Sequence, residues 1–203
     1  MYKKKKTGIR PNLGKTECWA ANVGEAPTGI PDLDAPYPSP PVWKGNLPLA
    51  ERGLMILGAP IGTEDFVKKV LAEKLAEESE FLERIVEISN VQLSWLLMYF
   101  CGSPRAAYLL RTIPPSLCRD YTVERDSLIR QILAKILNKQ NQDIIEKTDQ
   151  IHLSAKLGGL GLNSNERTSQ AAYWGSWCDA LHGMRERLPS FVTRIRHLLI
   201  QIS

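Results

Sequence analysis

The pattern of apolar and polar positions along the chain changes near residue 63, from short apolar runs to a helical periodicity. Thr63 can cap a helix, and after it apolar residues recur every three or four positions as far as Ile88, with Lys and Glu between them. This spacing predicts a long amphipathic helix whose charged positions form a solvated outer face. Glycine and proline breaks divide the rest of the chain into further predicted helices, over about residues 90–100, 103–113, 122–137, 164–188 and 190–202, and leave residues 138–156 ambiguous.

The predicted helix over residues 90–100 is apolar nearly all round, which predicts that the core surrounds it. Some aromatic side chains in the helical part could stack on nucleic-acid bases. Because they occur at helical spacing among Leu and Ala, we expect them to pack in the core instead. These residues are Trp95, Tyr99, Trp174 and Trp177.

The N-terminal part of the chain is built from short extended segments. Residues 22–48 are dense in proline and glycine, which predicts a loop, and apolar runs of strand length flank it at Thr16–Ala20 and Gly53–Leu57. We expect these two runs to pair like a hairpin across the long loop. The predicted fold class is mainly α (α+β): a helical bundle from about residue 63, with a small N-terminal β-hairpin-like appendage and a proline-rich loop.

The composition fits a protein that can bury a core, with 43% hydrophobic and 24% charged residues in a chain of 203. Its most apolar stretch, residues 91–101, is about half of the ~20 residues that a membrane span requires, so we expect no membrane association. The four cysteines lie far apart and form no CxxC pair, so the sequence predicts neither a disulfide framework nor a metal site. Unpaired cysteines are typical of a reducing compartment, so we expect an intracellular location, in the cytoplasm or nucleus.

The charge balance is mildly basic, with a formal net charge of +4, and it is uneven along the chain. Residues 51–100 carry nine acidic against five basic side chains, which makes that quarter a poor surface for phosphate. Basic residues gather instead in the run Lys3–Lys6 and among the arginines of the C-terminal part. This balance fits a nucleic-acid partner, although many proteins with the same charge bind none.

Three motifs, taken in their order, give the chain a resemblance to a known family. The segment Asn12-Leu-Gly-Lys-Thr-Glu17 precedes the long loop, the apolar run ends in Leu57-Gly-Ala-Pro60, and Leu157-Gly-Gly-Leu-Gly-Leu162 precedes an Ala- and Trp-rich helix. This order resembles the C-terminal part of the reverse transcriptases of non-LTR retrotransposons, which are RNA-directed DNA polymerases. The resemblance implies three parts: the end of the polymerase palm over residues 1–62, a thumb-like helical region over 63–137, and a post-polymerase helical region over 138–203.

The resemblance also implies nucleic-acid-binding residues. Lys15 matches the lysine of motif D, where an ammonium group lies near the leaving pyrophosphate, and Gly58 matches the turn of motif E, the primer grip, together with Ala59 and Pro60. A glycine there lets the backbone approach a nucleic-acid strand closely, although it would equally shape a strand-to-helix turn. Arginines that could follow a phosphate backbone lie further along, with ordinary solvated side chains as the other interpretation: Arg105, Arg111, Arg119, Arg125 and Arg130.

The chain departs from the family at the catalytic centre. Nucleotidyl transfer requires divalent metal ions held by carboxylates, which the family supplies from an upstream aspartate and an aromatic-x-Asp-Asp turn. No Asp-Asp pair occurs in this sequence, so we expect no catalytic residue, no metal and no cofactor in this chain, with Mg²⁺ belonging to the full-length family, and no polymerase activity from the chain alone.

Two functions from different classes therefore remain open. The first is a fragment of a retroelement polymerase that contributes binding of an RNA/DNA primer–template duplex, with the upstream polymerase region as a further partner. The second is a free-standing helical protein-interaction module without nucleic-acid affinity. The first predicts salt-sensitive duplex binding that is lost when Lys15, Arg105 and Arg111 are changed together.

Overall fold

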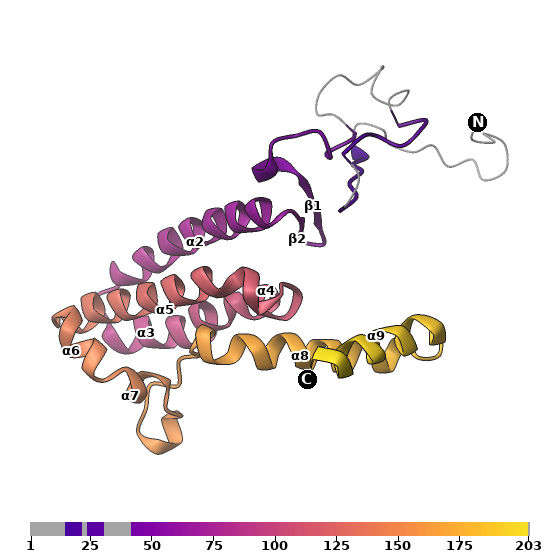
Figure 1. Cartoon of the computed structure of the whole chain (residues 1–203). Helices are drawn as coiled ribbons and strands as arrows, with labels where there is room; N and C mark the ends of the chain where they lie inside the picture. Colours follow the sequence, from indigo (N-terminus) through magenta and orange to yellow (C-terminus); the bar gives the residue numbers. More distant parts are fainter. Residues whose placement is uncertain (1–14, 22–23, 31–41, 203) are drawn as a thin grey trace, which may run out of the picture. The chain divides into compact units, whose positions relative to one another are not determined.

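The computed structural model describes residues 15–21, 24–30 and 42–202 (Figure 1). These residues form two compact units, Met1–Val70 and Leu71–Ser203, and each is described by itself. The predicted fold class is confirmed: the chain is mainly helical, with a small antiparallel pair of strands toward its N-terminal end. The prolines at 36, 38, 40 and 41, on which the predicted loop rested, lie outside the described residues.

The first unit contains a β-hairpin formed by β1 (Gly53–Ile56) and β2 (Ala59–Gly62), which pair antiparallel. The sequence-based pairing of Gly53–Leu57 with Thr16–Ala20 was wrong. Cys18 instead forms an isolated parallel bridge with Trp43. The physical reason is local: a two-residue turn joins β1 to β2, and closing so short a loop costs far less chain entropy than closing the long proline-rich one.

The start of the first long helix follows the hairpin directly. Helix α2 (Glu64–Val86) begins after Thr63, whose hydroxyl oxygen accepts a hydrogen bond from the backbone N–H of Phe66 at 3.4 Å. The same hydroxyl donates to the carbonyl oxygen of Leu49 at 2.5 Å, in a short 3₁₀ segment, η2 (Leu49–Glu51). Thr63 is therefore the predicted helix cap, and it also ties the helix start to the preceding loop.

The second unit is a set of packed helices. The segment after α2 is one interrupted helical run, which passes from α-helix through a π-helical turn and a 3₁₀ turn back to α-helix. Pro114 and Pro115 then end this run and start the next long helix, α5, earlier than the sequence pattern predicted. The elements are α3 (Val91–Leu97), η3 (Met98–Gly102), η4 (Ser103–Ala106), α4 (Ala107–Thr112) and α5 (Pro115–Leu137).

The prediction that the core surrounds residues 90–100 was wrong. Ser94 and Met98 are buried, but Val91 and Leu93 are about half exposed, and Phe100 is 67% exposed. The reason is that the run packs with one side against α5 and the following segments, and nothing in the described residues covers its other side. The core lies on the inner side and is formed by Leu82, Ile85, Met98, Ile129, Ile132, Leu133, Ala134, Ile144, Ile151 and Leu162.

Residues 138–156, which the sequence left ambiguous, form short helices that add Ile144 and Ile151 to this core. Asn138 ends α5 in the left-handed conformation, with a φ of 49°. The Gly-Gly segment then folds back on the preceding helix, because Leu162 N donates to the Ile151 carbonyl at 3.1 Å. The elements are α6 (Asn141–Glu146), α7 (Thr148–His152) and η5 (Ala155–Leu157).

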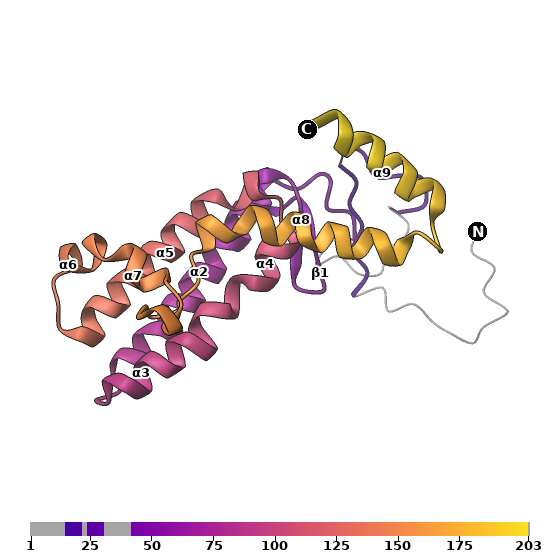
Figure 2. The ribbon, with the colours of Figure 1, turned by 90° about the horizontal axis from the view of Figure 1, so that it is seen from below.

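Two helices complete the second unit (Figure 2). Ser164 caps α8 (Asn165–Met184), because its hydroxyl oxygen accepts from the backbone N–H of Arg167; the sequence had left the cap open between Asn163 and Ser164. Helix α9 (Pro189–Ile202) begins one residue earlier than predicted, at the proline that was expected to separate it from α8. Helix α8 packs against α4 and α5 and makes a smaller contact with α9.

The predicted core packing of the four aromatic residues is confirmed for Tyr99 and fails for Trp174, whereas Trp95 and Trp177 are partly buried. Trp95 is partly buried, and its indole N–H donates to the carbonyl oxygen of Leu160 at 3.1 Å. Tyr99 is also partly buried and stacks near Trp95. In contrast, Trp174 is 44% exposed.

Candidate nucleic-acid interface

The motif that resembles a primer grip is the tip of the β1–β2 hairpin. Leu57 and Gly58 form its turn, both with positive φ, 51° and 86°. This is the backbone that a tight two-residue hairpin turn requires, and it accounts for the glycine without any ligand. Leu57 is 91% exposed and Gly58 is exposed, whereas Ala59 and Pro60 are buried. Of the residues expected to bind nucleic acid in this segment, Gly58 is therefore the accessible one, with Leu57 beside it.

Phe66 holds the base of the hairpin to the start of α2. A Cβ atom on Gly53 would lie 2.3 Å from Cδ1 of the Phe66 ring, and one on Gly62 would lie 2.6 Å from the Arg52 carbonyl oxygen. Only glycine fits at these paired positions, because the ring and the backbone occupy the space of a side chain. The turn is thus carried on a base that is anchored to the helix.

Lys15 is exposed, as a lysine available to phosphate must be. It lies just before an ion pair between Glu17 and Lys44, whose atoms are 3.2 Å apart. The backbone there is tied to the segment after the proline-rich loop, since Cys18 N donates to the Val42 carbonyl at 2.7 Å. The preceding residues of the motif D-like segment, 12–14, lie outside the described residues.

Arg105 and Arg111 lie on consecutive short helices of the second unit, and their side chains meet different neighbours. The guanidinium carbon of Arg105 lies 4.5 Å from the centre of the Phe81 ring on α2, a cation–π arrangement. Arg111 Nη2 lies 3.6 Å from a carboxylate oxygen of Asp179 on α8. Both arginines are exposed, but the structure does not place them on one common face.

Arg111 also borders a groove between α4 and α8 with a volume of about 410 Å³. Small residues of α8 form much of its wall, and the hydroxyl of Ser176 donates to the Arg111 carbonyl oxygen at 2.6 Å. Polar groups of Asn163, Asn165 and Thr168 also line the groove. The groove is therefore lined by both a cation and several side chains that can form hydrogen bonds.

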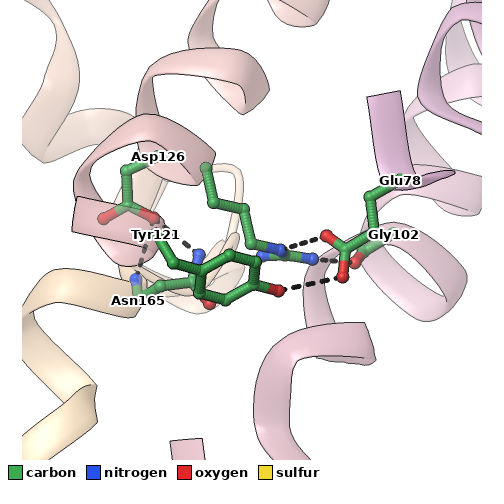
Figure 3. A network of polar contacts seen from close by, with 6 residues as sticks. Glu78, Gly102, Tyr121, Asp126 and Asn165 are labelled. Atoms are coloured by element: carbon green, nitrogen blue, oxygen red, sulfur yellow. Dashed lines mark hydrogen bonds and ion pairs between the residues drawn. The ribbon is translucent and has the colours of Figure 1, made fainter. Parts of the chain in front are cut away.

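Arg125, one of the arginines considered for phosphate contact, is fully buried and cannot reach a ligand. Its Nε donates to Glu78 Oε2 at 2.5 Å and its Nη2 to the carbonyl oxygen of Gly102 at 2.7 Å, and the Tyr121 hydroxyl donates to Glu78 Oε1 at 2.9 Å (Figure 3). Burial, and then the charge of Glu78, raises the pKa of Tyr121 far above its usual value. This network links α2, η3 and α5 through one buried ion pair.

A signal for this network was present in the sequence. Glu78 falls between Leu75 and Leu82 at helical spacing, and Arg125 falls four positions before Ile129 on the inward face of α5. A charge on an apolar stripe is rarely buried unless it is paired, so an acid and a base on two such stripes indicate a buried pair. We expected Arg125 either to contact phosphate or to be solvated, and did not predict its pairing with Glu78.

Among the described residues, no group of three or more His, Cys, Asp or Glu side chains lies close enough to hold a metal ion. Within the same residues, no helix is both long enough and apolar enough to cross a membrane. Comparison with known proteins adds no relative: no family model, no curated protein and no solved structure matches this chain.

Proposed function

We propose that this chain is the palm-end, thumb and post-polymerase part of a retroelement RNA-directed DNA polymerase, without the catalytic aspartates, and that it binds a primer–template duplex. The observation that carries the proposal is the hairpin whose Leu57-Gly58 turn is exposed and whose base leads straight into α2. The resemblance rests on this order, in which a helix follows a glycine turn. The turn offers a bare backbone at Gly58 to a nucleic-acid strand.

The exposed cations support the same proposal. The ion pair of Arg111 with Asp179 is exposed on both sides and long, and such surface pairs contribute roughly 0–1 kcal/mol, so a phosphate could replace the carboxylate. The guanidinium carbon of Arg105 lies over the Phe81 ring, and an arginine stacked on an aromatic ring keeps N–H groups free to donate to an anion. Lys15 adds a third exposed cation.

The proposal includes binding and excludes catalysis by the chain alone. The sequence has no Asp-Asp pair that could hold the two metal ions of nucleotidyl transfer. Its partners are an RNA/DNA duplex and the upstream polymerase region, and its location is intracellular, in the cytoplasm or nucleus.

The test is fluorescence anisotropy with a labelled RNA/DNA hybrid at low salt, comparing the natural chain with the triple variant K15A/R105A/R111A. We expect the triple variant to lose about tenfold or more in affinity, because three phosphate contacts are removed. The matched control is K139A/K147A/K156A, which removes three other exposed cations and the same total charge. Equal binding by the triple variant and the control would overturn the assignment of these residues.

A second candidate function is supported by the apolar side chains around the hairpin. Met55, Ile56, Leu57 and Ile61 are all exposed by about half or more, which is typical of a surface that a protein partner covers. The protein-interaction alternative predicts no anisotropy change with the hybrid at any salt concentration. The same titration therefore separates the two functions.

A further inference from the structure

Helix α8 has two faces that differ in chemistry. One face carries Ala172, Gly175 and Ser176, and it borders the groove beside α4. The other face, by the helical spacing of the sequence, carries Tyr173, Trp174 and Trp177. The buried residues of α8 are Asn165 and Ser169, both near its start, and the two views of the chain show the second half of α8 extending past α4 (Figures 1 and 2). The aromatic residues thus lie on the part of α8 beyond α4, where α9 is a further neighbour.

The three aromatic rings form one cluster, in which Trp174 is exposed and Tyr173 and Trp177 are partly buried. The ring centre of Tyr173 lies 5.3 Å from that of Trp174 and 6.3 Å from that of Trp177, and both pairs meet at steep angles of 74° and 72°. Edge-to-face contacts of this kind hold the rings in fixed orientations. With Trp174 44% exposed, the cluster presents indole surface to solvent without relying on a mobile loop.

Positive charge follows this cluster along the chain. Residues 180–203 contain four arginines and a single acidic residue, which is a net charge of +3. The side chains of Arg185, Arg187 and Arg194 are exposed, and Phe191, exposed as well, lies one helical turn before Arg194 on α9. From Trp174 to Arg185 the rise is roughly 16 Å, enough for about five phosphates of a stacked strand.

We propose that the aromatic cluster of α8, followed by the arginines at the α8–α9 end, is a binding site for single-stranded nucleic acid. Exposed aromatic rings bind unpaired bases by stacking, whereas the bases of a duplex are already stacked on one another, and arginines beside the rings neutralise the phosphates. Beyond Asp179, which pairs with Arg111, the positive excess of residues 180–203 favours a polyanion over a second copy of the chain, because a copy would bring the same positive charges to the interface.

The inference extends the proposed nucleic-acid function to a second, separate site, and it is tested with a fluorescein-labelled oligonucleotide of 15 thymidines. We expect the chain to bind it at low salt with quenching of tryptophan fluorescence, and W174A to bind about 5- to 100-fold more weakly. The control is F100A, which removes an exposed aromatic ring from another helix and should bind as the natural chain does. Trp174 is exposed, so W174A should keep the fold, which circular dichroism checks.

Equal affinity of W174A and the natural chain, or no binding of the oligonucleotide by the natural chain, overturns the inference. Self-association that W174A abolishes, seen by analytical ultracentrifugation without oligonucleotide binding, overturns it in favour of a second copy. The RNA/DNA hybrid is titrated in parallel. Binding of the hybrid but not of the oligonucleotide contradicts the stacking site alone. Binding of the oligonucleotide but not of the hybrid contradicts the proposed duplex function alone.

Discussion

Asp126 on α5 accepts hydrogen bonds from both the backbone N–H and the side-chain amide of Asn165, the first residue of α8, at 2.9 and 2.6 Å. Its other oxygen accepts from the Ser164 hydroxyl at 2.9 Å and from Glu166 N at 3.2 Å. A buried carboxylate on one helix thus satisfies the free N–H groups at the start of another (Figure 3). This contact fixes where α8 leaves the core, and with it the positions of the groove and the aromatic cluster.

Replacing the Asp126 carboxylate should therefore destabilise the fold. We expect D126A to lower the free energy of unfolding by about 2–4 kcal/mol, because it leaves buried N–H groups of α8 without an acceptor. Urea unfolding followed by circular dichroism measures the change. The control D120A removes an exposed carboxylate from the same helix and should change stability by less than about 0.5 kcal/mol. A D126A variant as stable as D120A would contradict the role of the cap.

The buried pair of Glu78 and Arg125 should behave differently from exposed pairs on the same helix. We expect E78A to lower the free energy of unfolding by about 3–5 kcal/mol, because it leaves the Arg125 guanidinium buried without a counter-charge. E77A, which breaks the exposed pair with Lys74, should lower the free energy of unfolding by less than about 1 kcal/mol. The double variant E78L/R125L should be more stable than E78A, and a double variant that is less stable than E78A would show that the charges are not coupled.

The raised pKa of Tyr121 gives the same network a dependence on alkaline pH. An unfolded tyrosine ionises near pH 10, but the folded one resists ionisation, so its contribution to stability is full below about pH 10 and is lost as the pH rises above it. The difference in unfolding free energy between the natural chain and Y121F should accordingly shrink from pH 9 to pH 11. Urea titrations at those pH values measure it, and a constant difference would be inconsistent with the raised pKa.

The hairpin turn should show a conflict between stability and binding at Leu57. A leucine with positive φ is strained, and asparagine before glycine suits this turn, so L57N should strengthen the hairpin by about 1 kcal/mol. Hydrogen exchange of the β1 and β2 amides should slow by about fivefold. If the exposed leucine contacts a ligand, the same variant should bind the RNA/DNA hybrid more weakly. Faster exchange in L57N would argue against the turn geometry.

The sequence predicted the elements whose signals are local. Thr63 marks a helix start through its own chemistry, and the structure has a helix beginning just after it. Proline also separates the last two helices as expected, although Pro189 itself is the first residue of α9. The mistaken strand pairing arose because a run with strand propensity does not indicate which other segment it pairs with. Residues 59–62, with one proline and one glycine among four residues, carry little strand propensity, and only the turn at 57–58 makes them the partner.

The sequence could not predict which side of a helix packs against another element. Phe100 and Trp174 lie in helices rich in apolar residues, yet both are exposed because few elements of the described chain cover those sides. Arg125 shows the reverse case, since its burial depends on Glu78, 47 positions earlier in the chain. Periodicity finds the apolar stripe of a helix, but long-range packing decides which residues it encloses.

The most direct test of the account is the salt dependence of binding to a labelled RNA/DNA hybrid. If Lys15, Arg105 and Arg111 contact phosphates, the logarithm of the association constant should fall with the logarithm of salt concentration with a slope of about −3. R105A/R111A should make this slope about two units shallower, whereas the exposed pair K139A/K147A should leave it unchanged. No binding by the natural chain at low salt, or the same slope in R105A/R111A, would contradict the proposed nucleic-acid function.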